Sequence, residues 1–325
     1  MIDLVQTETY SALVRNISSV FHVPYRREVV TVELSPLLIT QIVINQGDLV
    51  NALSASSNPH RPGFAYLVDI LGRAREEQDY DAELITDEGI RVVRVSISGA
   101  PIASPILLTS EVHAFLAQEP DYAFDQQSAV YFPISATELL IADGNDERSV
   151  AWALEASIQI FQNRPEAVSP CPYRIVDNKL TVLNEVGDSG LAERITNTTR
   201  WFSQIMHTRL KEYFTDGPES DWFKNEKLSF VEPVFGDAGV LATIKASEFN
   251  NGAQLLMPAV NYVKFVDDEV DEYHDEVIAS LESLYKIEEL CEPEPDMRPV
   301  MFRIRNFPTM LQMRDLKRLN GQETE

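Results

Sequence analysis

The chain contains 325 residues with 27 basic and 51 acidic side chains, which gives a formal net charge of −24. Hydrophobic residues make up 44% of the chain and charged residues 24%, as in ordinary folded proteins, and these values exclude a disordered acidic tail, a collagen-like fibre or a coiled coil as the whole chain. The negative charge repels phosphate groups, so we expect neither nucleic acid nor an anionic membrane as a partner.

The predicted elements begin with an amphipathic helix over residues 7–20, because Leu13, Val14 and Ile17 belong to an apolar series at spacings of three and four. A strand over 28–34 and a second helix over 36–53 follow. The clearest hairpin occupies residues 82–99, with Gly89 in the turn where a positive φ is needed.

The rest of the chain continues this mixture. Strands are predicted at 105–110, 129–135, 138–144, 173–183, 228–235, 239–246 and 300–306, and long amphipathic helices at 149–162 and 190–214. Short links between consecutive strands favour antiparallel pairing. We therefore predict an α+β fold of mainly antiparallel sheets with amphipathic helices packed on them.

Three segments are expected: an N-terminal α+β subdomain (1–125), a strand-helix-strand unit (126–189) and a C-terminal α+β subdomain (190–325). Placing Phe132 on Met257, an offset of 125 residues, aligns two apolar strands that each lead into an acidic turn. This alignment suggests an internal duplication, with a second copy of the unit in the C-terminal subdomain.

Residues 129–183 also carry a resemblance to a known family. An apolar strand with a proline leads into LLIADGNDERSVAWAL, and SPCPYRIVDNKL follows an amphipathic helix. This order resembles the C-terminal part of the YtpQ-type family of uncharacterised bacterial proteins. The resemblance implies a bacterial cytoplasmic α+β protein and assigns no catalytic residue.

Two further features favour the cytoplasm. The N-terminus lacks the apolar stretch of a secretory signal, and no segment reaches the roughly 18 to 20 consecutive apolar residues of a membrane helix. The two cysteines, Cys171 and Cys291, lie far apart and encode neither a disulfide framework nor a zinc cluster.

The densest group of chemical side chains is VDDEVDEYHDE, residues 266–276. If a helix begins here, Asp268, Asp271 and Asp275 share one face, where their oxygens could hold Mg²⁺ or Ca²⁺. His274 with a carboxylate could form a transition-metal pair. The alternative is a solvated helix start whose acids complement the helix dipole.

The C-terminal stretch 297–320 reverses the overall charge. The stretch contains six basic residues, among them Arg303, Arg305 and Arg314, and a single acid, Asp315. This stretch either pairs with the acidic body of the protein or forms a basic, methionine-rich docking surface for a partner.

These patterns lead to three functional hypotheses. The first is a non-catalytic acidic interaction protein, whose partner is a basic protein, another protein or a second copy of the chain. The second is a cation-dependent hydrolase that uses the carboxylates around 267–276 to activate water. The third is a DNA mimic that occupies basic nucleic-acid sites. No cofactor is specified, because the common nucleotide-binding and nucleophile motifs are absent from the sequence.

Overall fold

A computed structural model describes residues 9–22, 31–35, 37–46, 49–52, 63–87, 89–99, 102–119, 121–122, 125–177, 179–183, 189–236, 239–269, 276–287, 289–294, 297 and 300–322. Among these residues, helices and strands take similar shares and the four sheets are mostly antiparallel, which confirms the α+β prediction. The chain divides into two compact units, Met1–Phe202 and Ser203–Glu325. The segments expected at 1–125 and 126–189 both fall within the first unit, and its larger sheet takes strands from each.

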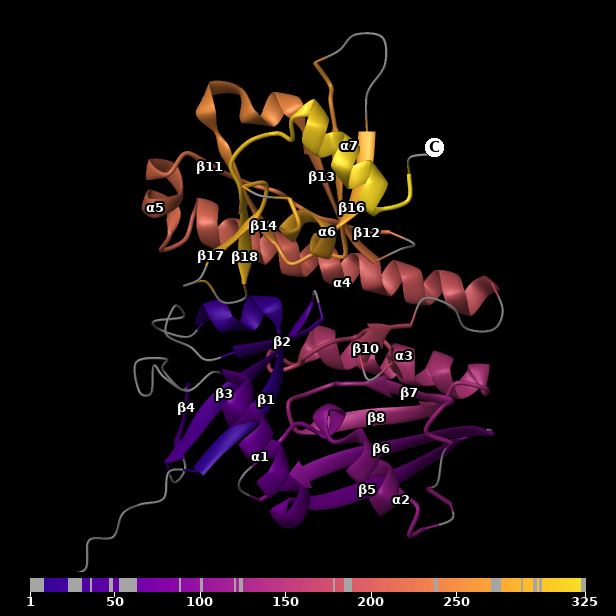
Figure 1. Cartoon of the computed structure of the whole chain (residues 1–325). Coiled ribbons are helices and arrows are strands. Elements are labelled where there is room, and N and C mark those ends of the chain that lie inside the picture. The colour runs from indigo at the N-terminus through magenta and orange to yellow at the C-terminus, as the bar shows by residue number, and fades with distance from the viewer. Residues whose placement is uncertain are drawn as a thin grey trace, which may run out of the picture. The chain divides into compact units, whose positions relative to one another are not determined.

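The first unit contains two sheets (Figure 1). The smaller sheet consists of β1 (Thr9–Asn16), β2 (Thr31–Ser35), β3 (Leu38–Gln46) and β4 (Leu49–Ala52). The larger sheet has the order β10-β9-β7-β8-β6-β5 and consists of β5 (Asp79–Asp87), β6 (Ile90–Ser98), β7 (Ala129–Phe132), β8 (Glu138–Asp143), β9 (Tyr173–Val176) and β10 (Lys179–Val182).

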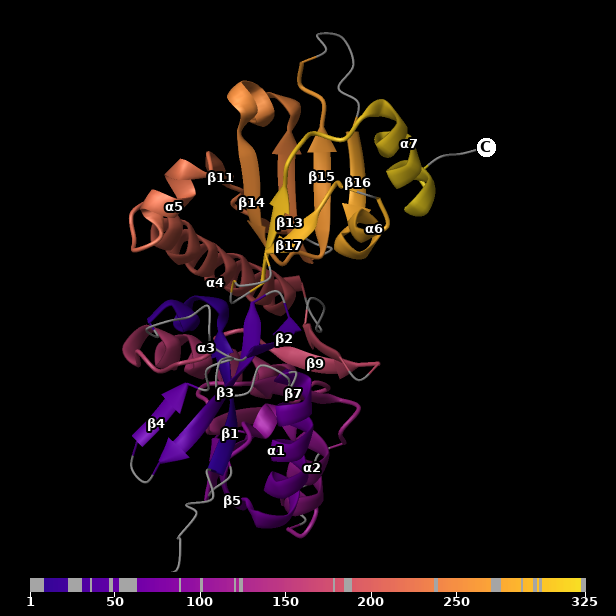
Figure 2. The same ribbon diagram turned by 60° about the vertical axis from the view of Figure 1, so that its left-hand side comes forward.

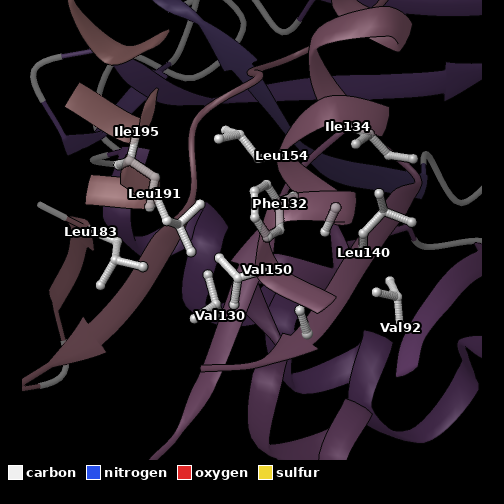
Figure 3. Packing of buried hydrophobic residues seen from close by; sticks show 12 residues of the cluster. Val92, Val130, Phe132, Ile134, Leu140, Val150, Leu154, Leu183, Leu191 and Ile195 are labelled. Atoms are coloured by element: carbon white, nitrogen blue, oxygen red, sulfur yellow. The ribbon is translucent and has the colours of Figure 1, made fainter. Parts of the chain in front are cut away.

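Helices cover both sheets. The helices of this part are α1 (Gly63–Glu77), α2 (Thr109–Leu116), α3 (Glu147–Asn163) and the start of α4 (Ser189–Thr215), with short 3₁₀ turns η1 (Ile17–His22) and η4 (Pro105–Leu107). Helix α1 packs on β1, β2 and β3, and α3 packs on β6, β7 and β8. Under α3, Val150 and Leu154 meet Phe132, Leu140 and neighbouring apolar side chains in a fully buried cluster (Figure 3).

The second unit contains two four-stranded sheets (Figure 2). One has the order β11-β14-β18-β17, with β11 (Leu228–Phe230), β14 (Gln254–Pro258), β17 (Glu292–Glu294) and β18 (Met301–Ile304). The other has the order β12-β13-β15-β16, with β12 (Val234–Gly236), β13 (Gly239–Lys245), β15 (Tyr262–Val266) and β16 (Glu276–Ser280). The described helices of this part are the second half of α4, α5 (Ser220–Asn225), α6 (Leu281–Tyr285) and α7 (Met310–Leu319), with the 3₁₀ turn η5 (Ala246–Gly252).

Most of the strongly patterned elements are confirmed. The hairpin around Gly89 forms as β5 and β6, with Gly89 at φ +88°. The predicted helices at 149–162 and 190–214 correspond to α3 and α4. The predicted strand 173–183 is instead the hairpin β9–β10, and 228–235 divides into β11 and β12, which belong to different sheets.

Three other predictions are wrong. The helix expected over 7–20 is β1 followed by η1, and residues 11–14 are all buried because both faces of β1 are covered. A strand buried on both faces loses its alternating pattern, so a helical spacing arose by coincidence. The helix expected over 36–53 is β3 and β4, in a stretch rich in β-branched residues. The strand expected at 105–110 is η4 and the start of α2, where Pro105 opens the first turn.

The duplication hypothesis remains a prediction. Strands β7 and β8 pair with each other, whereas their counterparts at the 125-residue offset, β14 and β15, belong to different sheets. The two segments therefore use their similar strand patterns in different pairings.

Candidate functional site

The acidic cluster 266–276 begins at the last residue of β15 and ends at the first residue of β16, and these two strands pair antiparallel. Its described carboxylate Asp268 accepts two hydrogen bonds from Ser247, from the backbone N–H to Oδ1 at 2.9 Å and from the hydroxyl to Oδ2 at 2.6 Å. These hydrogen bonds lower the pKa of Asp268, which is partly exposed. Both carboxylate oxygens of Asp268 therefore accept hydrogen bonds that fix Ser247 in the first turn of η5.

The other three residues of the metal hypothesis, Asp271, His274 and Asp275, lie outside the described residues. Across the described ranges, no three side chains of His, Cys, Asp or Glu come together closely enough to hold a metal ion. The metal hypothesis therefore remains a prediction, and it gains no described ligand besides Asp268.

Arg303, one of the three expected partner-binding arginines, is buried, with an exposed fraction of only 7%. Its guanidinium forms ion pairs with Glu294 and, at 3.1 Å, with Glu226, and donates to the amide oxygen of Gln254 at 3.1 Å. It also lies 5.9 Å from the ring centre of Trp222. The charge of Arg303 is therefore balanced inside the second unit.

The other two arginines differ from Arg303 in exposure. Arg305 is half-exposed and donates through two nitrogens to Glu292 Oε2, at 3.1 and 2.9 Å. Arg314, on α7, is exposed and has no ion pair within the part of the chain that the structure describes. Arg314 is therefore exposed without a described ion pair, whereas Arg305 is exposed and paired.

The start of α7 is fixed by a reciprocal pair of hydrogen bonds. Thr309 Oγ1 accepts from the Gln312 backbone N–H at 3.3 Å, and Gln312 Oε1 accepts from the Thr309 N–H at 2.9 Å. This helix is not among the elements predicted from the sequence, although Thr-x-x-Gln before an apolar pattern is typical of such a helix start.

The two faces of α7 have opposite characters. Met313 and Leu316 are buried on the side that packs on β16 and α6, beside which α7 lies in Figure 2. Met310 is 91% exposed and Leu311 60% exposed. Met310, Arg314 and Arg318 recur at spacings of four, so they share the outer face. We call Met310, Leu311, Arg314 and Arg318 the α7 outer face.

Charge on this face departs from the rest of the chain. The first turn of α7 contains no acid, while its last turn contains Lys317 and Arg318. The partial positive charge of the helix start is therefore not offset by a carboxylate within that turn. Arg318 pairs with Asp315 at 3.4 Å, so the α7 outer face combines exposed apolar area with the positive charge of Arg314 on a chain of net charge −24.

Searches against models of protein families, curated proteins and solved structures found no match to this chain. The described helices include none that is both long enough and apolar enough to cross a membrane.

A serine and a histidine also meet in the second unit, but inside the core. Ser203 Oγ lies 3.2 Å from His207 Nδ1, and both side chains are fully buried. His207 Nε2 has no hydrogen-bond partner among the described residues, and burial lowers the pKa of His207 to about 4. A nucleophile needs contact with its substrate, and burial denies Ser203 that contact.

Proposed function

We propose that this chain is a non-catalytic interaction protein whose α7 outer face docks an acidic, apolar segment of a partner protein. One observation carries the proposal: Met310 and Leu311 are exposed to 91% and 60% beside the open guanidinium of Arg314. Exposed apolar side chains bordered by polar ones are typical of protein-protein contacts, and methionine and arginine are enriched there.

Apolar contact supplies most of the affinity in this arrangement. Full burial of a methionine or leucine side chain stabilises a complex by about 1.5 to 3 kcal/mol. Exposed arginines contribute less to affinity, but they select carboxylates and accelerate association. The partner segment therefore carries apolar side chains flanked by Asp or Glu, and binding weakens as salt increases.

The test uses quantitative capture with three forms of the purified full-length chain. The double variant Met310→Ser with Arg314→Glu alters the α7 outer face. The control, Val68→Ser with Arg73→Glu, also replaces an exposed apolar residue by serine and an arginine by glutamate, on α1, where Val68 is 54% exposed and Arg73, which pairs with Asp69, is 47% exposed. We expect the wild type and the control to retain the same partner, and the α7 variant to lose it.

The binding segment of the captured protein is then synthesised and titrated. An acidic, apolar peptide that binds the wild type at least about ten-fold more tightly than the α7 variant supports the proposal. Equal retention by all three forms, or loss from both variants, contradicts it. Sedimentation of the three forms identifies a second copy of the chain as the occupant if a dimer disappears in the α7 variant alone.

The cytoplasm of a bacterium is the compartment that fits this proposal. Cys171 and Cys291 are both buried and free, and burial raises the pKa of each thiol to about 12. Thiols of this kind are unreactive and need no oxidising environment. The resemblance of residues 129–183 to the YtpQ-type family supports the same compartment.

A further inference from the structure

A hollow of about 560 Å³ opens on the first unit, and its lining includes no residue of the α7 outer face. It is lined by residues of β6, α3 and α4, namely Ile90, Arg148, Ala151, Trp152, Glu155 and Arg194. This volume lies within the range of about 300 to 1,000 Å³ that is typical of small-molecule sites.

Helix α3 supplies most of the wall from one stripe. Arg148, Ala151, Trp152 and Glu155 are separated by three, four and seven positions, so they share one face of the helix. The opposite stripe, which includes Val150 and Leu154, is buried in the cluster of Figure 3. Trp152 is half-buried and packs against the edge of that cluster while lining the hollow.

Two arginines frame this aromatic surface. Arg194, from α4, lies 3.2 Å from Glu155 Oε2, and both side chains are about half-exposed. An exposed pair of this kind contributes little stability, so Arg194 can exchange Glu155 for another anion at low cost. The guanidinium of Arg148 is exposed and has no ion pair within the described residues.

Charged side chains are distributed unevenly around the hollow. An adjoining hollow of about 780 Å³ shares Ile90 and contains the acids Asp87 and Asp121. Its arginine, Arg91, donates to the backbone carbonyl of Asp121 at 3.2 and 2.8 Å. Two acids and one arginine therefore lie beyond Ile90, whereas two arginines and one acid, Glu155, lie on the Trp152 side.

We propose that the Trp152 hollow binds a small aromatic anion. Its ring lies on Trp152, Ala151 and Ile90, and its carboxylate or phosphate accepts hydrogen bonds from Arg148 and Arg194. Aromatic surfaces favour stacked or edge-on rings, and guanidinium groups bind these anions through paired hydrogen bonds. The acids beyond Ile90 orient the ligand with its charged group toward the arginines.

The test follows the three indole N–H signals of the full-length chain by NMR, since tryptophan occurs three times in the sequence. Phenylacetate and phenyl phosphate are titrated as anionic probes, and benzyl alcohol as the neutral analogue. The substitution Trp152→Phe assigns the signal and retains an aromatic ring. We expect the Trp152 signal to move with at least one anion, and benzyl alcohol to bind at least about ten-fold more weakly.

Charge variants decide the role of the arginines. Arg148→Gln and Arg194→Gln each weaken the anion at least about ten-fold, while the control Arg73→Gln on α1 leaves affinity unchanged. The more tightly bound probe distinguishes a carboxylate from a phosphate ligand. An unmoved Trp152 signal with both anions at about 10 mM, equal binding of benzyl alcohol, or unchanged affinity in both arginine variants overturns the proposal. The readout is independent of α7, so its failure leaves the proposed docking function untouched.

Discussion

The side-chain amide of Gln322 pairs with both backbone groups of Ile278. Its Oε1 accepts from the Ile278 N–H at 3.3 Å, and its Nε2 donates to the Ile278 carbonyl at 2.6 Å. Asn320 Oδ1 accepts from the Ser280 N–H at 3.2 Å. Strand β16 is the last strand of its sheet, so these amides take the place of a further strand. Unpaired edge groups invite association with other chains, and the residues after α7 cover them here.

The substitution Gln322→Ala removes both hydrogen bonds to Ile278. We expect faster hydrogen exchange at the Ile278 amide and a loss of unfolding free energy of about 0.5 to 1 kcal/mol, because the site is exposed. Exchange measured by NMR checks this outcome. The control Gln159→Ala, on the exposed side of α3, leaves exchange at Ile278 unchanged, and unchanged exchange in Gln322→Ala would count against the pairing.

Arg303→Gln should destabilise the chain by about 2 to 3 kcal/mol, because it leaves Glu294 in a partly buried position without its cation. The matched change Arg305→Gln breaks a half-exposed pair with Glu292 and should cost at most about 1 kcal/mol. Urea unfolding of the two variants measures the difference. Equal losses of unfolding free energy in the two variants would contradict the prediction that the buried arginine contributes more to stability.

His207 should make stability depend on pH. Burial lowers its pKa to about 4, against about 6.5 in an unfolded chain, and the smaller effect of Glu232 acts in the opposite direction. Between these values the unfolded chain binds the additional proton, so stability falls as the pH falls from about 6.5 toward 4. Between about pH 7 and pH 4.5, His207 should lower the free energy of unfolding by on the order of 2 to 3 kcal/mol, and His207→Leu should abolish this decrease. Urea unfolding at both pH values checks this, and an identical loss in the variant would contradict it.

Two glycines should respond to alanine in opposite directions. A Cβ at Gly144 would lie 2.5 Å from the Ser128 carbonyl oxygen and against the Arg174 guanidinium, so Gly144→Ala should cost about 2 kcal/mol. Gly72 lies inside α1 with no atom within 4 Å of a Cβ, so Gly72→Ala should stabilise by about 0.5 to 1 kcal/mol. Thermal unfolding of both variants measures the contrast, and a stabilised Gly144→Ala would refute the close approach.

Local pattern was sufficient where one side of an element faces water. In β5 and β6, a turn with Gly89 separates two β-rich runs, and α3 keeps its apolar residues on the side that meets the sheet. The same local information predicted the antiparallel character of most pairings, because short links join consecutive strands. It failed for β1, whose two covered faces leave no alternation for the sequence to display.

The sequence by itself determined the α+β class, the hairpin at Gly89 and the long amphipathic helices, because periodicity and turn chemistry act over a few neighbouring residues. It placed Arg303 and Arg314 in one basic stretch, and only the tertiary structure separated them. Arg303 is buried against Glu226, 77 residues away in the chain, whereas Arg314 lies on the exposed side of α7. Contacts between residues so distant in sequence depend on how sheets and helices pack, and that packing decides which charges are balanced internally and which remain open to a partner.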